Sequence, residues 1–449
     1  MEDNNQKEVH VFGQAIEKYI GLLNSQMEAY PIIMNTLVAR LKACADRMKK
    51  FMDTNKIGQT ENGNEITFSI PMRVAKQFIK YNKDIEQSYL AIRLIPQNVV
   101  VAFVSIYDAF IADIINGIYS LHPELLNTCE KEYSFVDIIK FDSIEDIKQH
   151  IIEKEVESVL RESHKKQFDW LSKKINLKLT EDLPNYGAFI EITERRNLFV
   201  HANGKVSRQY LSEVPSNNKV DDNGKEIVLG DVLTATPEYV RHCYNILFEI
   251  GVKLGQVIWR KLDEKNSLEE ADSLLMDIIY DLLKNRKYEL SIIMSEFATK
   301  PYVKDFNKTH EFVKCINKAL GYYLSGNKEE CKSIIAKIDW SASSLRYKLA
   351  CAVLNEDYNE ACEIIKEIGN NQDMQQNYRE WPLFTDLREK ECFKNTYKEI
   401  FKTDFNYIET KPLKWEDIIK ESIEINRMKE EVSDNGNREP STASDCTSQ

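Results

Sequence analysis

The sequence is poor in the two residues that most often interrupt helices, with 15 glycines and 11 prolines among 449 residues. Leucine, isoleucine, lysine and glutamate recur throughout instead. Few helix breakers among good helix formers are typical of helical proteins, so we expect an all-α fold. The length allows two or three domains, and 43% hydrophobic and 29% charged residues are ordinary for a soluble globular chain.

Paired cysteine motifs and a secretion signal are also missing. None of the nine cysteines belongs to a Cys-x-x-Cys pair, and an odd number in a large chain indicates a reducing compartment. Residues Met1–Lys7 contain no apolar signal core. The most apolar run, Val99–Ile115, carries Asp108 and Asp113 and is too short to span a bilayer. We therefore expect a cytoplasmic protein without a membrane partner.

Spacings that bind metals or nucleotides are missing as well. The sequence has no Gly-rich phosphate loop and no Gly-x-Ser-x-Gly motif. Six of the seven histidines lack the His-x3-His or Glu-x-x-His spacing of metal ligands, and we interpret them as surface or core residues: His10, His122, His150, His164, His242 and His310. We expect neither a metal nor a cofactor.

The net charge of -12 excludes a protein that coats nucleic acid over a broadly basic surface. Any contact with nucleic acid must therefore be local. One cluster of basic side chains fits this requirement, because five of them fall within fourteen residues: Arg195, Arg196, His201, Lys205 and Arg208.

The N-terminal region, residues 1–95, is predicted to be helical. Apolar residues at helical spacing predict two amphipathic helices within residues 9–52, broken at Pro31. Residues 53–64 are polar and predict a loop. A short strand over Ile66–Ile70 and a helix over Arg73–Leu94, closed by Pro96, are expected to follow.

Residues 96–263 predict a helical bundle with a small β-hairpin insertion. Its expected helices are Asn98–Leu121, Ile144–Leu160, Arg161–Ile175, Tyr186–Ala202 and Pro237–Leu262. Asn203 and Gly204 supply the left-handed cap that ends the fourth of these helices. The hairpin is predicted over residues 215–231, where Asn-Asn and Asp-Asn-Gly precede a β-favouring stretch.

Residues 264–427 predict short helix pairs arranged as an α-solenoid, and residues 428–449 predict a disordered tail. Three segments share a pattern in which a small residue follows three positions after the first, and they open at Tyr288, Lys328 and Tyr358. Their offsets lie near the period of about 34 residues found in tetratricopeptide repeats. The segments resemble that family, and solenoids of this kind present concave surfaces to proteins or peptides.

The stretch from Glu191 to Gly204 carries the strongest indication of function. Arg196 is followed directly by Asn197, and four residues separate Arg196 from His201. An arginine offers a planar fork to phosphate oxygens, and a histidine gives and takes protons near neutral pH. This combination indicates chemistry on a phosphodiester.

The stretch resembles the HEPN superfamily, whose ribonucleases carry an arginine, four to six residues and a histidine, with a polar residue after the arginine. The resemblance covers about residues 96–262, and the helix with Asp108 is similar to the buried second helix of that family. It implies that Arg196, Asn197 and His201 are catalytic residues of a metal-independent endoribonuclease. Family members work as dimers with two motifs across one cleft, which implies a homodimer or higher homo-oligomer.

The expected reaction is attack of the RNA 2′-hydroxyl on the adjacent phosphate, leaving 2′,3′-cyclic phosphate and 5′-hydroxyl ends. Residues five positions apart on a straight α-helix point about 140° away from each other. Arg196 and His201 therefore meet only if the last helical turn is distorted or if a second copy completes the site. Lys205 and Arg208 extend the basic cluster and are expected to bind RNA.

Asp108 lies in an apolar helix, and a buried carboxylate needs a partner. Arg195, Arg196 and a neighbouring Tyr or Ser hydroxyl are the alternatives. We expect Asp108 and Arg195 to orient the catalytic residues.

Three functions remain open. The first is a regulated endoribonuclease in antiviral defence, abortive infection or stress response, with a protein trigger or regulator bound at the C-terminal repeats. The second is a non-catalytic HEPN-like scaffold that binds proteins through those repeats, with Arg196 and His201 in structural roles. The third is a toxin held by a separate antitoxin, although toxins of that kind are usually much shorter.

Overall fold

The structure is a computed structural model that describes residues 10–62, 65–128, 138–220 and 224–406. Contacts divide the described chain into two units. One comprises the chain up to Met27 and from Pro96 onward, and the other spans Glu28–Ile95. The predicted boundaries near 96, 264 and 428 stay predictions, and the predicted tail lies outside the described residues.

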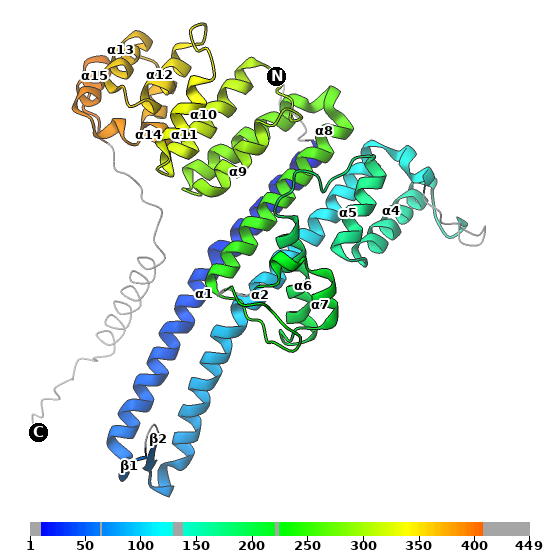
Figure 1. The fold of residues 1–449 in the computed structure, drawn as a ribbon, viewed down its shortest axis with the longest axis vertical. Coiled ribbons are helices and arrows are strands. Elements are labelled where there is room, and N and C mark those ends of the chain that lie inside the picture. Colours follow the sequence, from blue (N-terminus) through cyan, green and yellow to red (C-terminus); the bar gives the residue numbers. More distant parts are fainter. Residues whose placement is uncertain (1–9, 63–64, 129–137, 221–223, 407–449) are drawn as a thin grey trace, which may run out of the picture. The chain divides into compact units, whose positions relative to one another are not determined.

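The fold is all-α apart from one small β-hairpin (Figure 1). The longer helices are α1 (Val11–Asn55), α2 (Ala75–Leu121), α4 (Ile144–Leu160), α5 (His164–Ile175), α6 (Tyr186–His201) and α8 (Pro237–Lys284). A short helix, α7 (Arg208–Glu213), precedes α8. The C-terminal helices are α9 (Tyr288–Ala298), α10 (Lys308–Leu324), α11 (Lys328–Ala336), α12 (Leu345–Leu354), α13 (Tyr358–Ile368), α14 (Gln372–Glu380) and α15 (Glu391–Phe401).

Two prolines predicted to break helices lie inside them. Pro31 is within α1 and Pro96 is within α2, so the predicted break at Pro31 and the predicted end before Pro96 are both wrong. An interior proline removes one hydrogen bond and costs about 3 kcal/mol. In α2 the buried face resumes directly after the proline, with Val99 and Val100 both in the core, and this burial offsets the cost.

The unit spanning Glu28–Ile95 contains parts of α1 and α2 joined by the β-hairpin. Strand β1 (Gly58–Asn62) pairs antiparallel with β2 (Glu65–Ser69). The strand predicted over Ile66–Ile70 corresponds to β2, but the loop predicted for 53–64 is wrong because it includes β1. Phe51 packs edge-on against Tyr81, with ring centroids 5.6 Å apart, and connects the two helices.

In the first unit, α2, α5, α6 and α8 share one apolar core. Phe103, Tyr107 and Phe189 are each 0% exposed, and the Tyr107 and Phe189 rings lie 4.9 Å apart. Phe168 of α5 joins them at 5.6 Å from Phe189. By length and composition alone α2 is apolar enough to cross a membrane, and half of its most apolar stretch is buried in the protein.

The N-terminal end of α1 packs closely along α8. A Cβ added at Gly251 would lie 2.2 Å from Tyr19 Cε1, and one at Gly255 would lie 2.7 Å from Ile16 Cγ1. The Tyr19 hydroxyl donates to the Leu247 carbonyl at 2.7 Å, which fixes the ring over the first glycine. These two glycines therefore permit the close approach of α1 to α8.

The β-hairpin predicted over residues 215–231 does not form strands in the described part of that segment. The backbone makes a single isolated bridge there, Val220 to Glu226. A 3-10 turn at Ser216–Asn218 and left-handed Gly224 and Gly230 interrupt the extended backbone that strands require.

Helix α8 consists of two helices that meet at a kink. Asp263 and Ser267 adopt non-helical angles, with φ of -137° and -131°, so the first of them ends at Leu262 as predicted and the second continues to Lys284. The Trp259 indole donates to Ser267 Oγ at 2.6 Å across the kink.

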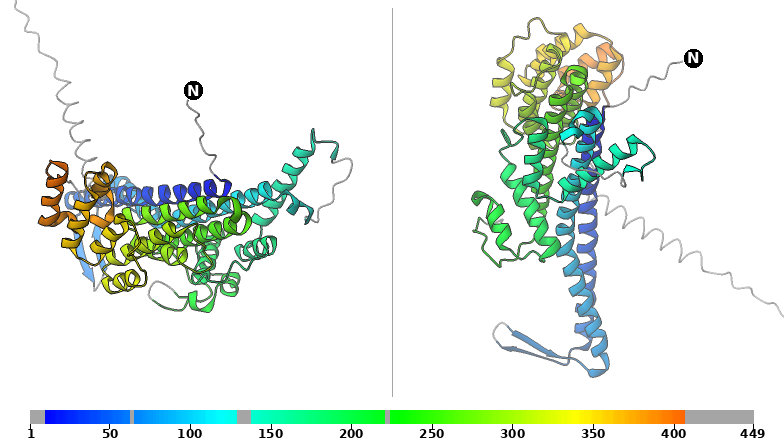
Figure 2. Two further views of the ribbon diagram at one scale, coloured as in Figure 1. Left: turned by 90° about the horizontal axis from the view of Figure 1, so that it is seen from above. Right: turned by 90° about the vertical axis from the view of Figure 1, so that its right-hand side faces the viewer.

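The C-terminal helices repeat one turn three times. The turns before α9, α11 and α13 each contain one residue with positive φ, at Arg286 (59°), Gly326 (91°) and Glu356 (63°). In each turn the next residue donates its backbone N–H to a carbonyl five positions earlier. The small residue of the sequence pattern is 0% exposed in all three copies: Ser291, Cys331 and Ala361. Consecutive helices thus form antiparallel pairs (Figure 2).

Candidate functional site

Helix α6 carries the Arg/His motif and ends as its sequence predicts. Asn203 and Gly204 adopt left-handed φ values of 50° and 81°. The Gly204 N–H donates to the Leu198 carbonyl at 3.0 Å, as in a Schellman cap. A Cβ at Gly204 would lie 2.4 Å from the Leu233 carbonyl oxygen, so only glycine fits. This cap fixes where His201 leaves the helix.

Asp108 of α2 joins two basic side chains. Its Oδ2 accepts from Arg196 Nη2 at 2.6 Å, and its Oδ1 lies 2.9 Å from His164 Nε2. The side chains are 20% exposed for Arg196, 24% for Asp108 and 9% for His164. Of the partners left open for Asp108, Arg196 is the one in contact. The carboxylate therefore orients a guanidinium that still reaches solvent.

Asn197 extends this cluster. Its Oδ1 accepts from Arg196 Nη1 at 3.2 Å. Burial raises the pKa of the neighbouring Glu194 carboxyl, while a hydrogen bond from Asn197 and the nearby basic side chains oppose that rise. A second acidic group therefore lies beside Arg196, in addition to Asp108.

Arg195 lies apart from this cluster in a buried network. Its Nε donates to Glu191 Oε1 at 2.6 Å, and its guanidinium stacks 4.0 Å from the centre of the Tyr239 ring. Tyr210 and Tyr239 also donate to the Glu191 carboxylate, at 2.7 and 2.8 Å. Burial alone would lower the pKa of Arg195, but its interactions with Tyr239 and Glu191 outweigh burial and raise it. The structure thus places Arg195 in the core, where it supports α6 from the side opposite Asp108.

His201 is exposed at the end of α6 and is not brought to Arg196. The helix is regular up to this point, because the Ala202 N–H donates to the Leu198 carbonyl at 2.9 Å. In the described part of the chain no hydrogen bond or ion pair joins His201 to Arg196 or Asp108. On a regular helix the two side chains point about 140° apart. The last turn of α6 is therefore not distorted in this structure.

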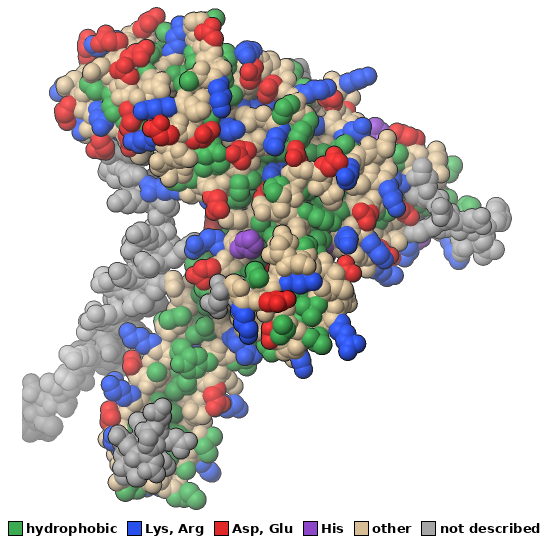
Figure 3. Space-filling view, in the orientation of Figure 1, with side chains coloured by type: hydrophobic (Ala, Val, Ile, Leu, Met, Phe, Trp, Pro, Cys, Tyr) green, Lys and Arg blue, Asp and Glu red, His purple; other side chains and the backbone are tan. Residues whose placement is uncertain are grey.

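Lys205 and Arg208, the expected RNA contacts, are both exposed beyond the end of α6. Arg208 begins α7, and Lys205 lies in an isolated bridge with Val232. Across the visible face of the molecule, basic and acidic side chains are interspersed (Figure 3). On this face the charges therefore do not separate into a broad basic surface.

Sequence reasoning missed two members of the site. His164, interpreted as a surface or core residue, contacts Asp108, and Glu194 lies among the side chains around Arg196. The sequence did indicate that the buried Asp108 carboxylate needs a partner. It could not identify His164 as that partner, because nothing in the spacing connects residues 56 positions apart. Only the packing of α5 against α2 brings His164 to the carboxylate.

The cluster offers a cation suited to an anionic ligand. Arg196 Nε is buried without a hydrogen-bond partner, and the partly exposed guanidinium contacts the Asp108 carboxylate, with Glu194 nearby. A phosphate oxygen is a fitting partner for such a group. Among the described residues, no three His, Cys, Asp or Glu side chains lie close enough together to hold a metal ion.

The chain was compared with family models, curated proteins and solved structures. No family model, curated protein or solved structure matches the chain.

Proposed function

We propose that the protein is an endoribonuclease of the HEPN type that needs no metal ion. The observation that carries this proposal is the Arg196 guanidinium, held by Asp108 and Asn197 and still accessible, on the same helix as the exposed His201. The resemblance of residues 96–262 to that superfamily supports it, and so does the local basic cluster in an acidic chain. Antiviral defence, abortive infection or a stress response is the context that this resemblance implies.

Arg196 holds the scissile phosphate and offsets the charge that develops on it. The RNA 2′-hydroxyl loses its proton to a base and attacks the phosphorus, and the bond to the 5′ oxygen breaks. The departing oxygen takes a proton from an acid. His201, together with a water molecule, fills these two roles. Asn197 hydrogen-bonds the phosphate or keeps Arg196 in place.

The separation of Arg196 from His201 on a regular helix supports an active oligomer. One copy presents Arg196 and Asp108, and a second copy brings its His201 to the same phosphate. A homodimer with two such sites is the simplest arrangement with closed symmetry.

The test is cleavage of a mixed RNA pool in the presence of EDTA. Arg196→Ala and His201→Ala are each expected to lower the rate about 100-fold or more, because each removes charge stabilisation or proton transfer. Lys337→Ala, an exposed substitution on the C-terminal helices, is the matched control and should retain full activity. Wild-type activity in the His201 variant would contradict the proposal.

A chimeric RNA tests the nucleophile separately. A strand with 2′-deoxyribose at one cleavage site should resist cutting at that site and be cut at the others. Cleavage at the deoxy position would overturn the mechanism while leaving the nuclease activity in place.

A protein-binding scaffold is the second candidate. It is favoured by the repeated helix pairs from α9 to α13, whose identical turns are typical of stacked binding surfaces. In that case Arg196 serves only to neutralise Asp108. Equal RNA cleavage and equal growth effects for wild type and both variants would then be expected.

A further inference from the structure

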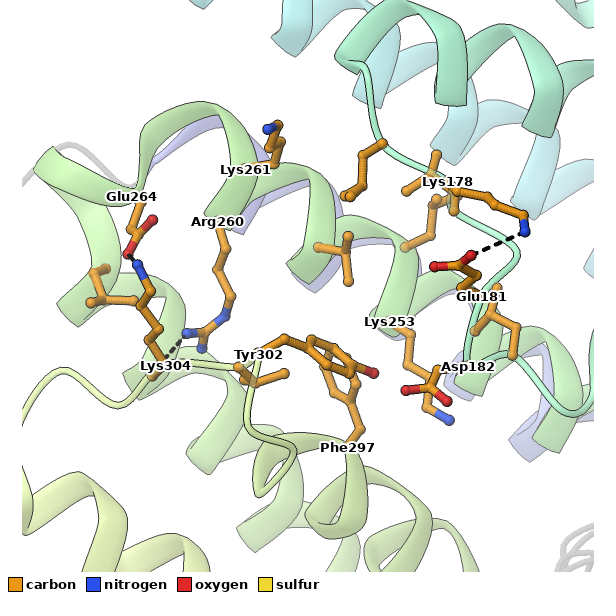
Figure 4. Close-up of a pocket in the computed structure, with 17 residues that line it drawn as sticks. Lys178, Glu181, Asp182, Lys253, Arg260, Lys261, Glu264, Phe297, Tyr302 and Lys304 are labelled. Carbon is orange, nitrogen blue, oxygen red and sulfur yellow. Dashed lines mark hydrogen bonds and ion pairs between the residues drawn. The ribbon is translucent and has the colours of Figure 1, made fainter.

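A cavity of about 640 Å³ is lined by residues other than those of the Arg196 cluster. It is bounded by residues 177–183 between α5 and α6, by α8, and by the segment that follows α9 (Figure 4). Its size is within the range of about 300–1,000 Å³ that is usual for sites of small molecules. None of the residues proposed to contact RNA lines it.

The lining combines an apolar wall with basic groups. Leucine and valine side chains line much of it, and Phe297 and Tyr302 add two aromatic rings. Five basic and three acidic side chains complete the lining. Figure 4 shows the Tyr302 ring between Arg260 and Lys253. A ligand with an apolar body and a negatively charged group fits this combination of side chains best.

Arg260 is fixed in position at the cavity. Its Nε, Nη1 and Nη2 donate to Gln256 Oε1, the Lys304 carbonyl and Asp272 Oδ1 at 3.1, 2.9 and 2.8 Å. A guanidinium has five N–H donors, so two remain for a ligand. Its side chain is 9% exposed, which protects an ion pair formed there from solvent screening.

Lys253 is the second buried cation of the lining. Its Nζ donates to Glu249 Oε1 at 2.5 Å, and its side chain is 9% exposed. The ammonium has further donors beyond this bond. Lys261 lies exposed at the rim and, among the described residues, forms no ion pair.

We propose that this cavity is a binding site for a small organic anion with an apolar or aromatic body. Arg260 and Lys253, on either side of the Tyr302 ring, are the two buried cations that its negative charge can contact, Phe297 and Tyr302 stack on its body, and Lys261 attracts it to the entrance.

The site is connected to α6 through hydrogen bonds. Asn185, which precedes α6, donates to Glu249 Oε2 at 2.7 Å, and Glu249 accepts from Lys253. An anion bound by Lys253 competes with Glu249 and thereby changes the contact that holds the start of α6. Ligand binding then regulates the Arg196 site; this consequence rests on the proposed function, whereas the binding itself does not.

The binding test uses the fluorescent probe 1-anilinonaphthalene-8-sulfonate and the full chain, without RNA. Wild type should bind one equivalent saturably, and N-phenyl-1-naphthylamine, which lacks the sulfonate, should bind at least ~10-fold more weakly. Equal affinity for the two probes would overturn the anion site.

Substitutions in the lining test whether the probe binds in the cavity. Val257→Trp, or Leu268→Phe if the first variant fails to fold, fills the space and should weaken binding at least ~10-fold. Lys261→Glu should weaken it several-fold, while the exposed Lys337→Glu serves as the control and should leave it unchanged. Wild-type affinity in a folded cavity-filling variant would show that the probe binds elsewhere.

Hydrogen exchange tests the connection to α6. The probe should change the exchange rates of the first amides of α6 in wild type but not in Val257→Trp. Unchanged rates at saturating probe would overturn the coupling, and because no RNA is present, this result is independent of whether the protein is a ribonuclease.

Discussion

Asp108 is the residue on which the geometry of the candidate site depends. Its carboxylate contacts Arg196 and His164, and all three side chains are largely buried. Removing one member of such a cluster leaves the others without their charge partner. The sequence indicated the aspartate and the arginine, but not the histidine that completes the group.

Asp108→Asn is expected to lower the free energy of unfolding by about 1–3 kcal/mol, because Arg196 and His164 lose a charged acceptor. RNA cleavage should fall with it, since Arg196 is no longer oriented. Chemical denaturation and the EDTA cleavage assay measure the two effects. Asp113→Asn on the same helix is the matched control: Asp113 forms a more exposed pair with Lys18 at 2.7 Å, and its loss should cost no more than about 0.5 kcal/mol. Equal effects of the two substitutions would contradict the role given to Asp108.

The raised pKa of the Glu194 carboxyl predicts that the stability of the protein depends on pH. Burial raises the pKa of its carboxyl above the ordinary value of 4.5. The folded state then binds more protons than the unfolded state just above pH 4.5, so the contribution of Glu194 to stability is lost as the pH rises through its folded pKa.

Glu194→Gln removes this dependence. Relative to wild type, the variant should gain stability as the pH is raised from about 4 toward 7, as followed by denaturant unfolding at several pH values. Glu153→Gln, on the exposed face of α4, is the control. A difference between wild type and Glu194→Gln that does not vary with pH would contradict a raised pKa.

At the scale of elements, the sequence predicted the bounds of α4, α6 and the apolar half of α2 closely. A buried apolar face accounts for this in α2, and the Asn203-Gly204 cap accounts for the end of α6. The prediction failed at Pro31 and Pro96, each of which lies inside a continuous helix. It also failed at residues 215–231, where turn residues were interpreted as a hairpin. A proline or a turn residue is a local signal, and in these segments it did not decide where the element ends.

The close approach of α1 to α8 depends on Gly251. Gly251→Ala should lower the free energy of unfolding by about 1–3 kcal/mol, because its Cβ would overlap the Tyr19 ring, which the bond to Leu247 prevents from moving. Gly21→Ala is the matched control, since a Cβ at Gly21 meets nothing within 4 Å. That substitution should instead stabilise α1 by about 0.5–1 kcal/mol. Thermal or denaturant unfolding distinguishes the two, and a stabilising effect at both positions would contradict the packing described here.

At the scale of the whole molecule, one chain does not bring the two motif residues Arg196 and His201 together. Arg196 lies against Asp108, whereas His201 is exposed on a different side of the same regular helix. The net charge of -12 leaves the cluster around α6 as the local basic site for the proposed RNA contact, and basic and acidic side chains are interspersed on the face visible in Figure 3. Sequence reasoning offered a second copy as one solution to this separation, and that solution stays a prediction.

The most direct test of a shared ribonuclease site is to mix two inactive variants. Arg196→Ala and His201→Ala, denatured and refolded together, form mixed dimers in which one of the two sites combines an intact Arg196 with an intact His201. We predict that each variant alone is inactive in EDTA and that the mixture recovers about a quarter of the wild-type rate, as random pairing into two-fold dimers requires. A mixture as inactive as its components would contradict a site shared between copies, and full activity in either variant alone would contradict the ribonuclease itself.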